Sequence, residues 1–439
     1  MFKKKTAAPF KIVSVFVVVI LIAFAEACAP AVAPTPNPTM QFETAVAMVR
    51  TVTAQAVPLL TPTVAATQTS TREPTATTTR TPTGTATTTR APTLIGTPTP
   101  VRVLSPNCYP MRGIAFSPDG KMLASLAGGA SVMDPICPYQ VKIWQVQTGE
   151  LLHTFDIGGG MDVAFSPDGL TLAASSVHFV KVANPPPSCP TCGRIDPGIS
   201  LVDVASGNEL RFFTTAGPGR TETGTELSVA FSPDGKTMAS STNYVAYSGT
   251  YPTIVREEFS GIRFWDVLTG QLIRSLRVGG GRLRFSPDGK TLALGGGAEV
   301  VFCDVTTGQV VRKVGEPGDD IRSFAFSPDW KILALGSGNY VVKVLDLNTG
   351  LVVHTIAGDK RTPMYQVVDV AFSPNGKVLA SAGYYDQMVK LWEPRTGRLI
   401  NNLMAHDRYV QRVSFSPDGS VLASVGDVNI WLWNMTTLQ

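Results

Sequence analysis

The sequence predicts an all-β fold made of seven copies of one four-stranded unit, behind an N-terminal region without this repeat. A turn sequence, Phe-Ser-Pro-Asp-Gly or a close variant, occurs seven times, beginning at Phe116, Phe165, Phe231, Phe285, Phe326, Phe372 and Phe415. Behind each copy come an apolar stretch and a second turn pattern, such as VKIWQVQTG or IRFWDVLTG. Short apolar runs between regularly spaced turns are typical of β-strands, so each unit is predicted to hold four of them.

The first 27 residues are predicted to be a signal peptide. Four lysines precede an apolar run at 12–25, which is shorter than the roughly 20 residues that a membrane-spanning helix needs. Ala25 and Ala27 fit ordinary cleavage between small residues. Cys28 directly behind this site resembles the lipobox of bacterial lipoproteins, although Glu26 departs from that motif. Lipidation at Cys28 is favoured, secretion and an uncleaved anchor stay open, and export is expected in each case.

Residues 28–100 are predicted to be a disordered stalk. Between Thr61 and Pro100, 18 of 40 residues are Thr and 6 are Pro. Such a tract has too little apolar surface to offset the entropy of ordering. We therefore expect a flexible tether between the N-terminus and the repeats at 101–439.

The strand before each Ser-Pro turn has one large and one small face. The Phe and the residue two positions earlier are apolar in every copy, whereas the residue just before the Phe is Ala or Ser in six copies and Arg284 in one. This asymmetry is expected of strands crowded around an axis. Trp330 replaces the turn glycine in the fifth copy, so that turn is expected to differ or to carry strain.

The second turn pattern carries a resemblance. It holds Trp144, Trp265, Trp392 and Trp433 in four copies, and Val202, Cys303 and Leu345 at the same place in the others. With this spacing the units resemble the blades of WD-repeat β-propellers over 101–439, which implies a seven-bladed propeller. The last copy matches the buried polar tetrad of that family at His406, Ser424, Asp427 and Trp433, a structural hydrogen-bond chain. The other histidines, His153, His178 and His354, show no shared spacing.

Closure of the ring needs one more strand. The seventh copy offers three strand candidates, and Val101–Leu104 is the unassigned one. We predict that it pairs with residues 429–434, because closure removes exposed strand edges.

Composition and motifs argue against several function classes. Lys and Arg number 37 against 33 Asp and Glu, and no long basic run indicates nucleic-acid binding. No phosphate-binding loop, H-E-x-x-H or G-x-S-x-G is present, so no catalytic residue, metal site or cofactor is predicted. The aspartates of the repeated turns are interpreted as turn caps. The alternative is a hydrolase at the channel mouth, where Asp162, Arg282, Asp369 and Arg412 share one repeat position.

Four cysteines are predicted to form disulfides. An even set of cysteines in an exported chain indicates disulfide bonding. Cys108 with Cys137 and Cys189 with Cys192 are the expected pairs, all on one rim of the ring. A four-cysteine zinc site is the open alternative, because C-x-x-C is a metal-ligand spacing.

A partner-binding surface is predicted on the same rim. The connections between second and third strands are long in the first three units and short in the other four. Irregular loops on a rigid scaffold commonly carry binding. Phe179, Tyr139, Tyr244, Tyr247 and Tyr251 supply aromatic anchors. The sequence thus predicts a monomeric, non-enzymatic scaffold that binds a protein, a peptide or another ligand outside the cytoplasm, held at a membrane by its N-terminal lipid.

Overall fold

The computed structural model describes residues 98–106, 110–128, 138–181, 193–214, 220–248, 255–316, 318–357, 366–384, 387–404, 406–407, 409–426 and 428–438. These all belong to one compact unit spanning 93–185 and 191–439. The signal peptide, nearly all of the stalk, and Cys28 lie outside the described residues. Among the described residues, no helix combines the length and the apolar character that crossing a membrane requires.

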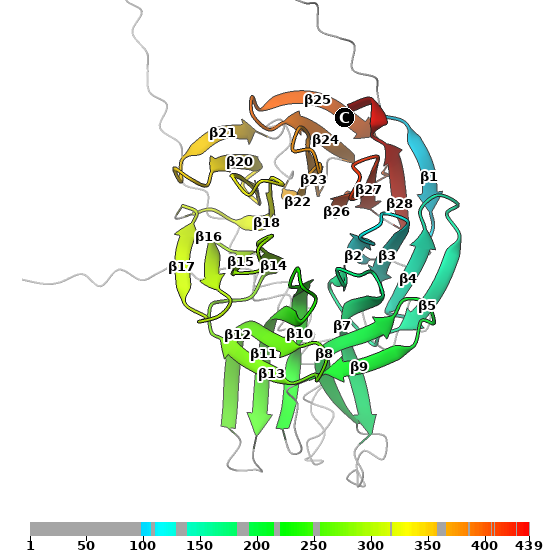
Figure 1. Ribbon diagram of the computed structural model, residues 1–439, viewed down its shortest axis with the longest axis vertical. Helices are drawn as coiled ribbons and strands as arrows, with labels where there is room; N and C mark the ends of the chain where they lie inside the picture. Colours follow the sequence, from blue (N-terminus) through cyan, green and yellow to red (C-terminus); the bar gives the residue numbers. More distant parts are fainter. Residues whose placement is uncertain are drawn as a thin grey trace, which may run out of the picture. The chain divides into compact units, whose positions relative to one another are not determined.

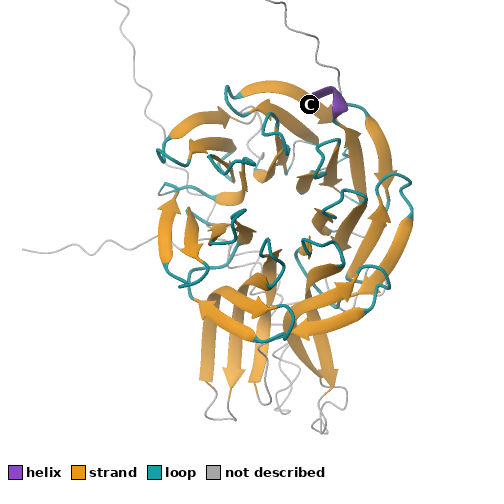
Figure 2. Cartoon of the chain, in the orientation of Figure 1, coloured by secondary structure: helices purple, strands orange, loops and turns teal. Residues whose placement is uncertain are grey.

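Seven four-stranded antiparallel sheets surround a central channel, which confirms the predicted seven-bladed β-propeller (Figure 1). Figure 2 shows that strands and their turns account for nearly all of the described chain, with one short 3-10 helix at Thr436–Leu438. The first strand of each blade lies innermost and the last strand outermost.

The strands are short in most blades. Blade 1 consists of β2 (Met111–Phe116), β3 (Met122–Ala127), β4 (Gln140–Gln145) and β5 (Leu151–Asp156). Blade 4 consists of β14 (Arg282–Phe285), β15 (Thr291–Gly296), β16 (Glu299–Asp304) and β17 (Val310–Val314), and blade 5 of β18 (Ile321–Phe326), β19 (Ile332–Ser337), β20 (Val341–Asp346) and β21 (Val352–Ala357). Blade 6 consists of β22 (Val367–Phe372), β23 (Leu379–Gly383), β24 (Met388–Glu393) and β25 (Arg398–Met404).

Blades 2 and 3 have much longer strands. Blade 2 consists of β6 (Val163–Phe165), β7 (Thr171–Lys181), β8 (Gly193–Asp203) and β9 (Glu209–Phe213). Blade 3 consists of β10 (Arg220–Phe231), β11 (Thr237–Ser248), β12 (Val255–Asp266) and β13 (Leu272–Leu276). The strands β7, β8, β10, β11 and β12 have 11 or 12 residues each, and Figure 1 shows them running past the outline of the ring.

Blade 7 is closed by the strand that precedes blade 1. It consists of β26 (Arg412–Phe415), β27 (Val421–Gly426), β28 (Asn429–Asn434) and β1 (Pro100–Leu104). Leu104 pairs with Ile430 and Val103 with Trp431. The predicted closure is therefore confirmed, and the two ends of the repeat region share one sheet.

The core lies between neighbouring blades. At six of the seven interfaces, the Phe before a Ser-Pro turn packs against the blade that precedes it, where the matching strand presents Ala or Ser. Phe165 and Val163, for example, lie in one cluster with Ala115 of blade 1. This pairing of a large face with a small one explains the alternation in the sequence.

The short turns that join first to second strands and third to fourth strands form one rim of the ring, which we call the turn rim. In the first turn, the Ser117 hydroxyl donates to Asp119 Oδ1 at 2.7 Å, and the Lys121 amide donates to the same oxygen at 3.0 Å. These bonds lower the pKa of Asp119, and the first turns of the other blades with Asp at this position repeat the arrangement. Trp330 keeps the same turn, with φ 55° and its amide donating to Ser327 O. The expected strain is thus present, while the turn itself is unchanged.

Candidate functional site

The opposite rim, where second strands connect to third strands and each blade leads into the next, is elaborated in blades 2 and 3. We expected irregular loops there, and for most of these residues that expectation is wrong. The pairing of β7 with β8 continues to Lys181 opposite Gly193. The pairing of β11 with β12 continues to Ser248 opposite Val255, and β10 pairs with β11 from Arg220 onward. The sequence of these segments mixes Thr, Tyr and Val and has few apolar runs, so it did not indicate strands. Strands can pair in register without burying one face.

The two extensions form a projection, defined here as residues 175–181, 193–198, 220–226, 243–248 and 255–260. Strand β10 of blade 3 packs against both β7 and β8 of blade 2. At the base, His178 stacks on Phe212 at 3.6 Å between ring centroids, and its Nε2 lies 3.1 Å from Glu209 Oε1. The projection therefore has two sheets in contact, anchored on the outer strand of blade 2.

Backbone groups at one edge of the projection have no strand partner among the described residues. Strand β13 pairs with β12 only from Ile262 to Trp265, and the Gly279 amide donates to Ser260 O, so the stretch Val255–Phe259 is paired on the β11 side alone. Such an edge offers a row of amide and carbonyl groups to an added strand.

The predicted binding residues fall at different places. Phe179 lies on β7 opposite Ile195, and Tyr244 and Tyr247 lie on β11 opposite Phe259 and Arg256. Tyr139 is half-buried beside blade 2, with the Arg112 guanidinium 5.6 Å from its ring centroid. Tyr251 lies outside the described residues.

The cysteine predictions also fall outside the described residues, because Cys108, Cys137, Cys189 and Cys192 are all there. Cys303 is a free, buried thiol whose pKa is raised by burial. In the described part of the chain, no group of three or more His, Cys, Asp or Glu side chains is placed to hold a metal ion.

The four charged residues of the channel mouth line one cavity, and three of them, Asp162, Arg282 and Asp369, hydrogen-bond between blades. Asp369 accepts hydrogen bonds from Arg282 Nη1 at 2.6 Å, from the Ser323 hydroxyl at 2.7 Å and from the Val413 amide at 3.0 Å. One carboxylate of blade 6 thereby joins blades 4, 5 and 7. Its side chain is only 3% exposed.

Asp162 has the same role on the other side of the channel. It accepts hydrogen bonds from the Ser228 hydroxyl at 2.7 Å and from the Val229 amide at 3.3 Å, both in blade 3. Ser228 then accepts from the Leu283 amide of blade 4 at 3.2 Å. A general base needs a free lone pair near the reacting proton, and a general acid needs a proton to give. Both carboxylates accept several hydrogen bonds from backbone, hydroxyl or guanidinium donors, so this geometry favours a structural role over hydrolysis.

Three members of the expected polar tetrad form one chain. The Trp433 indole donates to the Ser424 hydroxyl at 2.9 Å, and His406 Nε2 lies 2.8 Å from the same oxygen. Burial lowers the pKa of His406 to about 4. Asp427 lies outside the described residues.

The Trp–Ser pair recurs in blades 1, 3 and 6. Trp144 donates to Ser125, Trp265 to Ser240 and Trp392 to Ser381, at 2.8 to 3.0 Å. In the three blades without this Trp, the position of the Ser holds Ala174, Leu294 or Leu335. A buried indole N–H needs an acceptor, and a buried Ser hydroxyl in a blade without the Trp would lack a partner. This joint replacement was visible in the sequence.

A second set of contacts between blades was not predicted, and the expectation that the other histidines share no position is wrong for two of them. His153 and His354 do share a position: each lies third in an outer strand, opposite Ile143 and Val344. The same position holds Arg102, Arg211, Arg274, Arg312 and, in blade 6, Asn401.

Arginine and histidine side chains at this position contact backbone carbonyl oxygens of the next blade. Arg211 donates to Leu268 O at 3.0 Å and to Thr269 O at 2.6 Å, and Arg102 donates to Gln147 O at 2.8 Å. Arg312 and His354 contact Leu347 O and Arg395 O in the same way. The blades are thus fastened at the outer strands as well as at the channel.

Comparisons with known proteins agree with this architecture. The family model "WD domain, G-beta repeat" matches residues 351–393 and 397–434. Each match begins at an outer strand, β21 or β25, and ends near the third strand of the following blade, β24 or β28. The sequence repeat is therefore offset by one strand from the structural blade, which is why β1 completes blade 7.

Two curated proteins are similar over part of the chain. The WD repeat-containing protein SL1-17 of Schistosoma mansoni is 32% identical over 145 residues, which are 32% of this chain and 46% of that protein. The uncharacterized WD repeat-containing protein sll1491 of Synechocystis sp. is 26% identical over 160 residues, 36% of this chain and 40% of that protein. The match thus spans less than half of each relative. Together with the ring, these similarities support a WD-repeat β-propeller.

Proposed function

We propose that this chain is a protein-interaction scaffold that acts outside the cytoplasm, and that the projection of blades 2 and 3 holds the partner. The observation that carries the proposal is the uneven elaboration of the ring. Five strands of blades 2 and 3 have 11 or 12 residues, whereas no strand of blades 4 to 7 exceeds 7. Closure and blade packing do not require the additional residues, because the other blades pack without them.

The chemistry of the projection favours a polypeptide partner. A small ligand needs a concave site that covers most of its surface. The projection instead offers an extended two-sheet body and a backbone edge at Val255–Phe259. An extended peptide can add to such an edge as a further strand, with main-chain hydrogen bonds supplying affinity.

The N-terminus supports the location. A positively charged start, an apolar run and Cys28 behind small residues suit export with lipidation, and the Thr/Pro-rich stretch at 61–100 suits a tether. The scaffold would then stand on the outer side of a membrane, within reach of partners held there.

Partner binding can be tested by shortening the projection without disturbing the blades. Thr242 and Gly261 are paired, so replacing residues 243–260 with Asn-Gly leaves a two-residue hairpin at the end of a normal blade. His178 and Asp196 are paired, so residues 179–195 of blade 2 can be replaced in the same way. Lys290→Ala, at an exposed turn on the turn rim, is the matched control.

The readout is cross-linking and mass spectrometry on intact cells. We expect discrete cross-linked partners with the native chain and with Lys290→Ala, and their loss when the hairpin of blade 3 is shortened. Unchanged melting temperatures will show that the rings are folded. Identical partners for all variants would contradict the proposal.

The location has its own test. Cys28→Ala is expected to abolish lipid labelling of the chain and to release it from membranes or block its processing. Normal processing with unchanged membrane retention would contradict lipidation at Cys28.

A further inference from the structure

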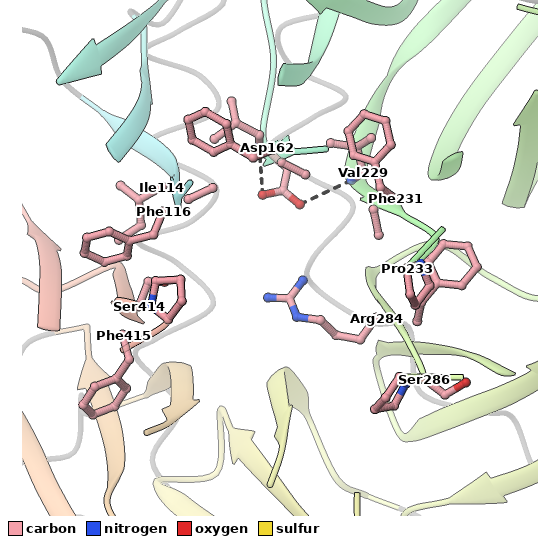
Figure 3. Close-up of a pocket in the computed structure, with 18 residues that line it drawn as sticks. Ile114, Phe116, Asp162, Val229, Phe231, Pro233, Arg284, Ser286, Ser414 and Phe415 are labelled. Carbon is pink, nitrogen blue, oxygen red and sulfur yellow. Dashed lines mark hydrogen bonds between the residues drawn. The ribbon is translucent and has the colours of Figure 1, made fainter. Parts of the chain in front are cut away.

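The turn-rim half of the central channel contains a cavity of about 440 Å³ (Figure 3). Its wall presents polar and apolar surface in nearly equal parts, and the lining includes Phe116, Phe165, Phe231 and Phe415 together with Pro233 and Pro417. Sites for small molecules commonly have such a volume, with aromatic side chains and a few polar groups in the wall. The charged residues of this lining are Asp162 and Arg284.

Arg284 breaks the pattern of the repeat. The matching residue of the other six blades is Ala115, Ala164, Ala230, Ala325, Ala371 or Ser414, and each lets the next blade's Phe pack closely. Figure 3 shows the Arg284 side chain reaching into the cavity instead, toward the side that holds Asp162. It lines three cavities at the channel, of about 440, 270 and 60 Å³.

The guanidinium of Arg284 has unused donors. An arginine carries five N–H donors. Among the described residues, the one hydrogen bond of this group runs from Nη1 to the carbonyl oxygen of Leu283, at 2.8 Å. The remaining donors face the lumen, where the side chain is reachable although protein surrounds it. This desolvation lowers the pKa of Arg284, and an arginine still stays protonated at neutral pH.

The carboxylates of the channel do not neutralise this group by contact. Asp162 and Asp369 are held by the hydroxyl, amide and Arg282 donors described above. Arg412 adds a third guanidinium to the lining of the channel, and its Nη1 donates to the backbone carbonyl oxygen of Gln411. Three guanidinium groups thus stand against two carboxylates, which leaves one positive charge in excess around the lumen.

We propose that this cavity binds an organic anion, a carboxylate attached to an apolar or aromatic body, with Arg284 as the group that binds the carboxylate. Two N–H groups of a guanidinium match the two oxygens of a carboxylate, and the excess charge favours an anion over a neutral or cationic ligand. The phenylalanines would cover the apolar body. A free small acid and the C-terminus of a polypeptide share this chemistry.

The probe is 3-phenylpropanoate, added to the full chain and followed by isothermal titration calorimetry. We expect saturable binding that is about tenfold or more tighter than the binding of the neutral 3-phenylpropanamide, because the amide loses the charge-assisted pair. Binding should also be tighter than that of acetate, which has the carboxylate without the ring. No saturable binding, or equal binding of acid and amide, would overturn the proposal.

Arg284→Ala is the decisive variant, because it installs the residue that five other blades carry and should therefore fold. It is expected to weaken 3-phenylpropanoate binding about tenfold or more and to leave amide binding unchanged. Arg322→Ala, an exposed arginine paired with Asp320, should bind as the native chain does. Equal binding by Arg284→Ala and the native chain would overturn the assignment of Arg284.

A peptide arm identifies the source of the carboxylate. A tripeptide ending in Phe with a free C-terminus is compared with the same peptide amidated. Binding of the free form alone, lost in Arg284→Ala, supports recognition of a polypeptide end. Binding of 3-phenylpropanoate but of neither peptide supports a free small acid. Equal binding of both peptide forms would count against carboxylate recognition.

Discussion

Blade 7 and blade 4 both consist of four antiparallel strands, but different side chains hold them together. In blade 7, Trp433 and His406 meet at the Ser424 hydroxyl. In blade 4, Cys303 and Leu294 occupy the positions of the Trp and the Ser, and both are buried. Blade 7 also takes its outer strand from the other end of the repeat region, whereas blade 4 is continuous.

This difference shows that the propeller backbone accepts two solutions for one interior site. A polar pair needs both of its members, and an apolar pair needs neither hydroxyl nor indole. Blades 1, 3 and 6 follow blade 7, and blades 2 and 5 follow blade 4. Substitutions in blade 7 should therefore be more costly when they remove one member of a hydrogen-bonded set.

Removing β1 is the largest expected perturbation, since blade 7 loses its outer strand and the contacts of Arg102 and Leu104 with blade 1 are lost as well. Deletion of residues 98–106 exposes the edge of β28 and removes Leu104, which is 2% exposed. Lost burial and backbone pairing should cost roughly 4 kcal/mol or more of unfolding free energy. Urea unfolding measures this. Deletion of nine residues at 71–79, in the Thr/Pro-rich tract, should change little, and equal stability of the two deletions would contradict the closure.

Ser424→Ala is expected to have the next largest effect on stability. It leaves the buried Trp433 indole and His406 without their common partner, at a cost of roughly 2–4 kcal/mol. Ser125→Ala in blade 1 removes the partner of one indole, Trp144, so its cost should be smaller, about 1–3 kcal/mol. Urea unfolding of both variants gives the difference. A larger loss in Ser125→Ala would refute a distinct contribution of His406.

The pH dependence of stability separates the two blades further. The pKa of His406 is about 4 in the folded chain and close to 6.5 when unfolded, so folding favours the neutral ring. Stability from this group is complete above pH 6.5 and is lost as the pH falls toward 4. By pH 5 the loss should be about 2 kcal/mol. His406→Asn should be less stable at pH 7.5 and should show a shallower decline, and an unchanged slope would contradict the burial of His406.

The sequence was sufficient to predict features that depend on neighbouring residues in the chain and recur from blade to blade. The turns, the number of blades and the closing strand all follow from apolar alternation and turn chemistry. The projection was not predicted as strands, because its sequence shows no regular alternation of apolar and polar residues. The ties of Asp162, Asp369 and Arg211 join different blades, so they become visible only when the ring places those blades side by side. The Trp–Ser pairs could have been found, since each Trp and its Ser change together from one repeat to another.

The smallest expected effect lies in blade 5, next to blade 4, where Trp330 occupies the left-handed position of the turn with φ 55°. Its ring stacks on Phe326 at 3.9 Å between centroids and 9° between planes. Trp330→Gly removes the strain and the stack together, so the two changes nearly offset and the net shift should be within about 1 kcal/mol. Trp330→Ala removes the stack and keeps the strain, so it should be less stable than Trp330→Gly by about 1 kcal/mol. Thermal unfolding of the two variants decides the point, and a more stable alanine variant would show that this backbone position is unstrained.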